Sequence, residues 1–218
     1  MCGRYSLYLP MDKIALALAM DMPELAIKPR YNMAPTQLLP VVSSDRPDEI
    51  SLYRWGLIPS WAKDHSIGNR MINARAETML EKNSFRTAAR KRRCLVLADG
   101  FYEWKKITGG KIPTRISFDD GRLITFGGLW ESWRDAEEKE IRSFTILTTT
   151  PNEVCAAIHD RMPVIIAAGD REKWLDVSIS PEELSELLRP FPAIGMMTEE
   201  VSKLVNSPAN DGPEILRK

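Results

Sequence analysis

A cysteine at the second position carries the most distinctive chemistry of this chain. If the initiator Met1 is removed, the chain begins with Cys2, whose α-amine and thiol then lie on adjacent carbons. Such a 1,2-aminothiol condenses with an aldehyde to an imine, and the thiol closes on the imine carbon as a thiazolidine ring. Reference pKa values of about 8 for the amine and about 8.5 for the thiol leave both groups near reactivity at neutral pH. The alternative is an ordinary residue in a frayed terminus.

Few polar residues could serve Cys2 as an acid or a base. The chain has two histidines, and His65 lies in a polar loop where we expect it at the surface. His159 lies between a predicted helix and a predicted strand, a junction that often directs a side chain into a cleft. It could equally interact with the dipole at the helix end. Glu103 interrupts an apolar, aromatic strand. Burial would raise its pKa, whereas a solvent-facing Glu103 would do nothing, and spacing leaves both open.

Two tryptophans flank a loop that contains glycine and proline. Trp55 and Trp61 lie at its two ends. At the rim of a cleft they would offer flat faces for stacking with nucleic-acid bases, and in a core they would fill volume.

Composition describes a globular chain of 218 residues, with 44% hydrophobic and 28% charged residues. No run approaches the roughly 18 apolar residues of a membrane span, and the start does not resemble a signal peptide. We therefore expect a protein of the cytoplasm that associates with the nucleoid or nucleus. Three widely spaced cysteines, Cys2, Cys94 and Cys155, predict neither a disulfide framework nor a zinc site.

The zero net charge hides an asymmetry between the two halves. Residues 1–115 hold 19 Lys and Arg against 11 Asp and Glu, and residues 116–218 hold 11 against 19. A local positive patch is enough for non-specific affinity to nucleic acid. The imbalance could also belong to an ordinary solvated surface.

The pattern of elements predicts an α+β fold. Alternating apolar residues predict strands at 38–43, 50–55, 115–118, 123–130, 141–149 and 164–167, and a pair of strands over 94–104 that is broken at Asp99 and Gly100. A hairpin turn is predicted at Gly109 and Gly110. Helical spacing and helix-start signals predict helices at 11–21, 84–93, 152–158, 170–175 and 180–188. Short strands without regular βαβ alternation indicate one domain over residues 1–218 with mainly antiparallel pairing. Residues 206–218 are expected to form a flexible tail.

Six sequence blocks carry a resemblance to a known family. They are CGRY (2–5), RYNMAP (30–35), WGLIP (55–59), INARAET (72–78), DGFYEW (99–104) and IHDRMP (158–163). In this order they resemble the SOS response-associated peptidase (SRAP) family, which shields abasic sites in single-stranded DNA by covalent crosslinking. The resemblance implies a single compact domain with a mainly antiparallel, barrel-like β core flanked by helices.

The resemblance also implies roles for single residues. The family's nucleophilic cysteine matches Cys2, and its active-site asparagine, glutamate and histidine match Asn73, Glu103 and His159. Arginines in the same blocks match positions that would hold phosphates, namely Arg4, Arg75 and Arg161. Cys2 would form a thiazolidine crosslink with the aldehyde of an abasic site after Met1 removal, without metal or organic cofactor.

Two other functions remain open. The first is a cysteine-type peptidase, whose substrate could be the bond between Met1 and Cys2. The second is a non-covalent protein that binds single-stranded DNA. For each of these functions we expect a monomer that does not bind a membrane.

Overall fold

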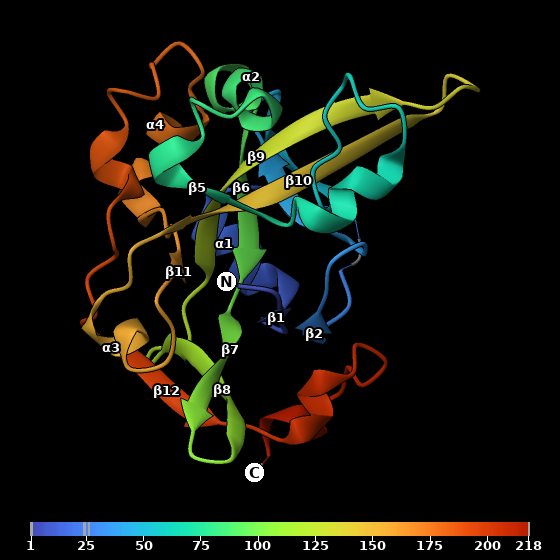
Figure 1. Ribbon diagram of the computed structural model, residues 1–218. Coiled ribbons are helices and arrows are strands. Elements are labelled where there is room, and N and C mark those ends of the chain that lie inside the picture. The colour runs from blue at the N-terminus through green and yellow to red at the C-terminus, as the bar shows by residue number, and fades with distance from the viewer. Residues whose placement is uncertain (1, 24, 26, 218) are drawn as a thin grey trace.

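Strands dominate the structure, a computed structural model that describes residues 2–23, 25 and 27–217 (Figure 1). The described strands are β1 (Tyr5–Leu7), β2 (Arg30–Met33), β3 (Leu38–Ser43), β4 (Arg46–Trp55), β5 (Asn73–Arg75), β6 (Arg93–Ala98), β7 (Gly100–Ile107), β8 (Gly110–Phe118), β9 (Ile124–Arg134), β10 (Glu140–Thr149), β11 (Met162–Pro163) and β12 (Met196–Glu200). The α-helices are α1 (Met11–Leu18), α2 (Asn83–Lys91), α3 (Glu153–Ala156) and α4 (Arg171–Leu175).

Five of these strands close into a barrel. Strand β10 pairs with β4, β4 with β3, β3 with β6, β6 with β9, and β9 again with β10. Only the β10–β4 contact among these is parallel. The expected α+β fold with a mainly antiparallel, barrel-like core is therefore confirmed. Inside the core, the Trp55 and Phe144 rings stack with their centroids 6.3 Å apart.

A second sheet carries the order β12-β8-β7-β1-β2. The chain passes from the barrel into this sheet at Asp99, between β6 and β7. The Asp99 carboxylate accepts hydrogen bonds from Ser6 and from the backbone of Tyr8 and Leu9, and it forms an ion pair with Arg115. Because these contacts fix β1 against β7, they hold the N-terminal residues against the second sheet.

Four of the five predicted helices are present as α1 to α4, and two other expected elements need correction. Residues 180–188 do not form an α-helix, because the bonds from Glu183 to Ser180 and from Leu184 to Pro181 span three residues. This spacing gives turns and a 3₁₀ helix at Ser185–Leu188. The strand expected at 164–167 is replaced by β11 and one isolated bridge between Ile165 and Phe126. No helix in the described part of the chain is long and apolar enough to cross a membrane.

The C-terminal segment packs against β2 instead of extending away as a tail. The buried Asn32 side chain donates hydrogen bonds to the carbonyl oxygens of Ser207 and Asn210, at 2.9 and 2.7 Å. The Asp211 carboxylate accepts from the backbone nitrogens of Tyr31 and Asn32, both at 2.7 Å. These contacts anchor the segment beside the second sheet, at the bottom of Figure 1.

Candidate active site

Cys2 is held in place through its backbone. Its carbonyl oxygen accepts a hydrogen bond of 2.8 Å from Asn73 Nδ2, and the residue is fully buried. Asn73 begins β5, which pairs in parallel with β10, so the barrel fixes its position. The Asn73 Oδ1 atom is buried and accepts no hydrogen bond from any described residue. A buried acceptor of this kind is costly unless a partner arrives, and it lies beside the candidate nucleophile.

Glu103 and His159 form a pair in the same region. Glu103 lies on β7 and is only 4% exposed, which settles the orientation that its sequence left open. His159 Nε2 lies 4.0 Å from Glu103 Oε2 and follows α3, as the junction of helix and strand predicted. Burial raises the pKa of the Glu103 carboxyl, and attraction to His159 opposes that increase. A carboxyl of this kind exchanges protons closer to neutral pH than an exposed one.

His159 has two contacts at Nδ1 that require different forms of the ring. The backbone N–H of Arg161 donates to Nδ1 at 3.1 Å, which requires a bare nitrogen. An Asp160 carboxylate oxygen lies 2.9 Å away, which requires a protonated one. The Asp160 side chain is 89% exposed and can turn away, whereas the Arg161 N–H belongs to the backbone. The neutral ring therefore favours its proton on Nε2, toward Glu103.

The Cys2 thiol is protonated at neutral pH in this environment. Burial raises its pKa well above the ordinary value, and the Glu103 carboxylate raises it further. The same two causes raise the pKa of Cys155 on α3 to about 12. Glu103 therefore lies close enough to act electrostatically on both thiols.

A cleft of about 630 Å³ opens next to Glu103 and His159. Sequence reasoning missed four other polar or aromatic residues that line it, which are Trp104, Lys106, Lys111 and Asp160. The hairpin turn at Gly109 and Gly110 could have predicted that the two lysines lie together, because a hairpin places the residues before and after its turn opposite one another.

The three candidate arginines have different environments. Arg75 is exposed. Arg4 donates hydrogen bonds to Asn32 Oδ1 and to the Val205 carbonyl. Arg161 binds both carboxylate oxygens of Glu77, at 2.7 and 2.8 Å. Arg4 and Arg161 thus hold protein groups in this structure, and only Arg75 has an exposed side chain.

The two candidate tryptophans differ in their exposure to solvent. Trp55 is fully buried and its indole nitrogen donates to the Ile72 carbonyl at 2.8 Å. The prediction that its face is open to a base is therefore wrong, because the ring fills the barrel core. Trp61 is 59% exposed and stays a candidate for stacking.

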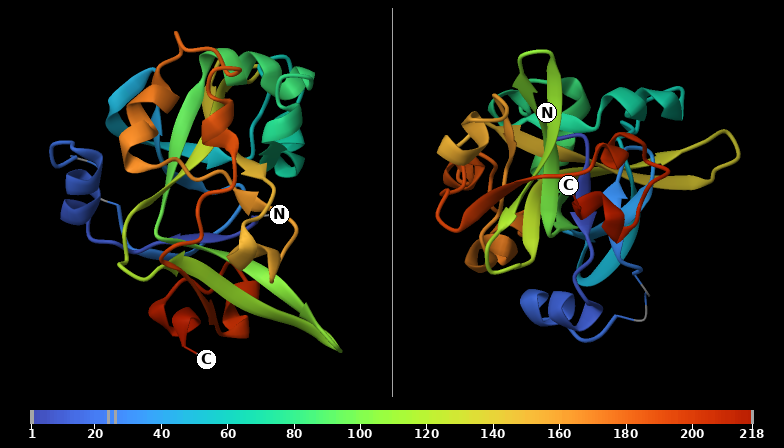
Figure 2. Two further views of the ribbon diagram at one scale, coloured as in Figure 1. Left: turned by 90° about the vertical axis from the view of Figure 1, so that its left-hand side faces the viewer. Right: turned by 90° about the horizontal axis from the view of Figure 1, so that it is seen from below.

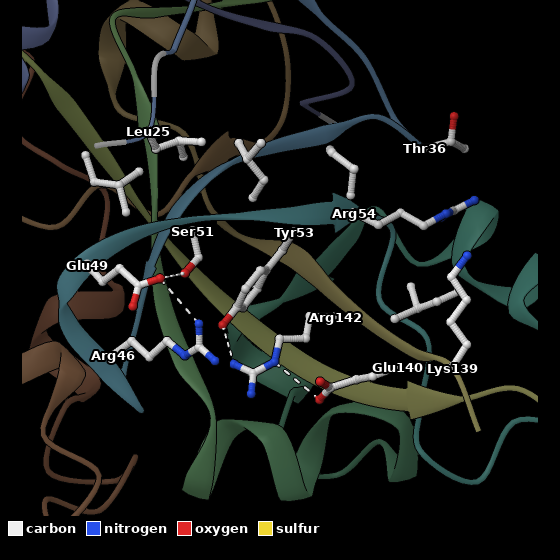
Figure 3. A pocket seen from close by; sticks show the side chains of 14 residues that line it. Leu25, Thr36, Arg46, Glu49, Ser51, Tyr53, Arg54, Lys139, Glu140 and Arg142 are labelled. Atoms are coloured by element: carbon white, nitrogen blue, oxygen red, sulfur yellow. Dashed lines mark hydrogen bonds and ion pairs between the residues drawn. The ribbon is translucent and has the colours of Figure 1, made fainter. Parts of the chain in front are cut away.

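Another hollow, of about 760 Å³, lies along β3, β4 and β10, and none of the four candidate catalytic residues lines it (Figure 3). Two of its four basic side chains form ion pairs within the protein. Arg142 contacts Glu140 and Tyr53, and Arg46 contacts Glu49. These pairs offset part of the positive charge of the hollow, while Arg54 donates to the neutral side chain of Asn69 at 2.8 Å.

A metal site would need several His, Cys, Asp or Glu side chains in one place. Among the described residues, no three or more of these side chains are grouped so that they could hold a metal ion.

Known proteins resemble this chain over nearly its whole length. The chain is 44% identical to the abasic site processing protein YoqW of Bacillus subtilis, over 99% of both chains. It is 32% identical to the abasic site processing protein HMCES of Rattus norvegicus, over 99% of this chain and 75% of that protein. A crystal structure of a protein from Bacteroides thetaiotaomicron superposes with a TM-score of 0.90 and 29% identity, covering both chains fully. Residues 1–208 match the family model described as SOS response associated peptidase (SRAP). This chain therefore belongs to the SOS response associated peptidase family.

Proposed function

We propose that this protein captures abasic sites in single-stranded DNA as a covalent thiazolidine adduct of Cys2. The observation that carries the proposal is the hydrogen bond of 2.8 Å by which Asn73 holds the buried Cys2 in place. The names of the relatives, which are abasic site processing proteins, support the same substrate.

The first step uses the α-amine, which is free only after Met1 is removed. Met1 itself lies outside the described residues. The amine adds to the C1′ aldehyde of the opened deoxyribose, and loss of one water gives an imine. Asn73 orients this step by its bond to the Cys2 carbonyl, and its unfilled Oδ1 is available to a donor from the sugar or the amine.

The second step uses the thiol. The sulfur forms a bond to the imine carbon, and the thiol proton moves to the imine nitrogen, so the ring closes without a further leaving group. The raised pKa of Cys2 fits this order, because a protonated thiol leaves the amine to react first. It opposes a peptidase mechanism, which needs a thiolate as the attacking group.

Glu103 and His159 would move the protons of these steps. A buried carboxyl with a raised pKa can donate a proton to the departing water and recover one from the amine nitrogen as the imine forms. It can then relay the thiol proton to the imine nitrogen as the ring closes. His159, with Nε2 4.0 Å from Glu103, would assist opening of the sugar. All four residues come from one chain, so a monomer suffices. Such a protein acts where single-stranded DNA occurs, in the cytoplasm at the nucleoid or in a nucleus.

The imine also predicts a side reaction. An imine that is not trapped promotes β-elimination and cleavage of the strand, which would appear as lyase activity. Closure by the Cys2 thiol removes the imine and protects the strand.

Three proteins on an oligonucleotide with one abasic site test this proposal. Processed protein should give a denaturation-resistant adduct without added reductant, with a mass of protein plus DNA minus one water. A form that retains Met1 should give no thiazolidine, because its Cys2 nitrogen is an amide. Cys2→Ala should form only an imine, visible after borohydride reduction or as strand cleavage. A stable adduct from Cys2→Ala without reduction, or none from the processed protein, contradicts the aminothiol mechanism.

A further inference from the structure

Two lysines face each other across the hairpin of β7 and β8. Lys106 lies directly opposite Lys111 in the register of the two strands, and both side chains are exposed. Like charges at directly opposed positions of an antiparallel pair repel each other. Neither ammonium group forms an ion pair or hydrogen bond with any residue that the structure describes. An anion between them would relieve the repulsion.

The tip of this hairpin has no packing role. A Cβ added at Gly109 or Gly110 would meet no atom within 4 Å. The hairpin projects from the body of the protein, on the side opposite α1 in both views of Figure 2. The two lysines are therefore accessible, and replacing them should not disturb the core.

The lysines belong to the cleft that contains the candidate proton-transfer residues. Lys106 and Lys111 line the same hollow of about 630 Å³ as Glu103 and His159. Glu103 lies 4.0 Å from His159 Nε2, and the Asp160 side chain is 89% exposed. Among the described residues no carboxylate forms an ion pair with Lys106 or Lys111, so the positive charges at the hairpin are left for a partner from outside, unlike Arg46 and Arg142 of the hollow in Figure 3.

We propose that Lys106 and Lys111 together bind a phosphodiester group of the DNA strand adjacent to the abasic nucleotide. This inference rests on the proposed function and adds a phosphate-binding site that neither the family's sequence blocks nor the candidate arginines include. A sugar that reaches Glu103 and His159 lies within the same cleft as the two ammonium groups, so the neighbouring phosphate passes the hairpin. Lysine side chains are long and flexible enough to converge on it as point charges.

The first test measures non-covalent binding, so that it does not depend on adduct formation. In a Cys2→Ala background, Lys106→Glu with Lys111→Glu should weaken binding of an undamaged single-stranded oligonucleotide by about tenfold. The matched control is Lys13→Glu with Lys139→Glu, which changes the net charge equally at exposed positions on α1 and before β10. The control should change affinity by less than about twofold. Equal weakening in both double variants would overturn the proposal.

The second test locates the phosphate. Single phosphodiesters along an oligonucleotide with one abasic site are replaced by neutral methylphosphonates. The replacement should weaken binding to the parent protein most where the replaced linkage lies beside the abasic site. The same replacement should have no further effect in Lys106→Gln with Lys111→Gln. The salt slope of this variant should be lower by about 0.7 for each phosphate that the lysines no longer neutralise. A replacement that weakens the parent and the glutamine variant equally at every linkage would overturn the proposal.

The two hypotheses fail separately. Should processed protein form no adduct while the hairpin variants still lose DNA affinity, the covalent mechanism is wrong and the phosphate site stands. Should the adduct form while the hairpin variants bind DNA like the control, only the phosphate site is wrong. When Cys2 is retained and the DNA is saturating, the hairpin variants should form the adduct at the parent rate, and a slower rate there contradicts a role confined to binding.

Discussion

Substitution of Glu103 by glutamine removes proton transfer by this side chain while keeping its size and shape. The side chain is buried and lies 4.0 Å from His159, so an amide of the same size keeps the packing and removes the exchangeable proton. General acid–base residues contribute about 10²- to 10⁴-fold to rates. The adjoining cleft of about 630 Å³ can admit water as a substitute relay. We therefore expect the lower end, a loss of about 10²-fold, or about 2.7 kcal/mol of transition-state stabilisation.

The pH dependence gives this prediction a second readout. Because burial raises the pKa of Glu103, the carboxyl is protonated over a wider pH range than an exposed glutamate. The rate in the parent protein should have a component that falls as pH rises through this raised pKa. That component should be absent in Glu103→Gln, whereas the increase caused by deprotonation of the α-amine should remain. The assay is the time course of denaturation-resistant adduct at several pH values.

Glu131 provides a matched control. It is also 4% exposed, and burial likewise raises its pKa, but it pairs with Arg92 at the barrel. For each carboxyl the raised folded pKa stabilises the fold below the unfolded pKa of about 4.3, and this stability is lost as pH rises through the folded value. As pH rises above about 4, both glutamine variants should therefore lose less melting temperature than the parent. Only Glu103→Gln should slow adduct formation, and an unchanged rate in that variant at neutral pH would refute the proton-transfer role.

Two further predictions concern stability. Gly128→Ala should lower the free energy of unfolding by about 1–3 kcal/mol, because its Cβ would lie 2.9 Å from both Cys94 Sγ and the Thr145 carbonyl; Gly110→Ala, where a Cβ meets nothing, is the control in thermal melting. Asp211→Ala should release the C-terminal segment at a cost of about 1.5–3 kcal/mol, because two backbone N–H groups lose a charged acceptor. Limited proteolysis should then cleave this segment faster, and unchanged cleavage would show that other contacts hold it.

Local patterns were enough for most of the fold. The glycines at 109 and 110 predicted the hairpin that became β7 and β8, and alternating apolar residues predicted the barrel strands. The helix expected at 180–188 was wrong although its start signals are strong. Ser180 accepts the Glu183 N–H as a cap should, but the following bonds close after three residues. Cap residues favour a helix start without fixing which hydrogen-bond spacing follows.

The sequence alone determined the chemistry that is possible here, since an aminothiol at the second position and one histidine beside a helix end can be recognised without coordinates. Only the tertiary structure decided which side chains are available. Trp55 is buried in the barrel, and Arg161 is held by Glu77, which lies 84 residues earlier in the chain. Lys106 and Lys111, in contrast, are left exposed beside Glu103 and His159. Exposure and charge pairing depend on contacts between residues that are distant in sequence, and no local pattern records them.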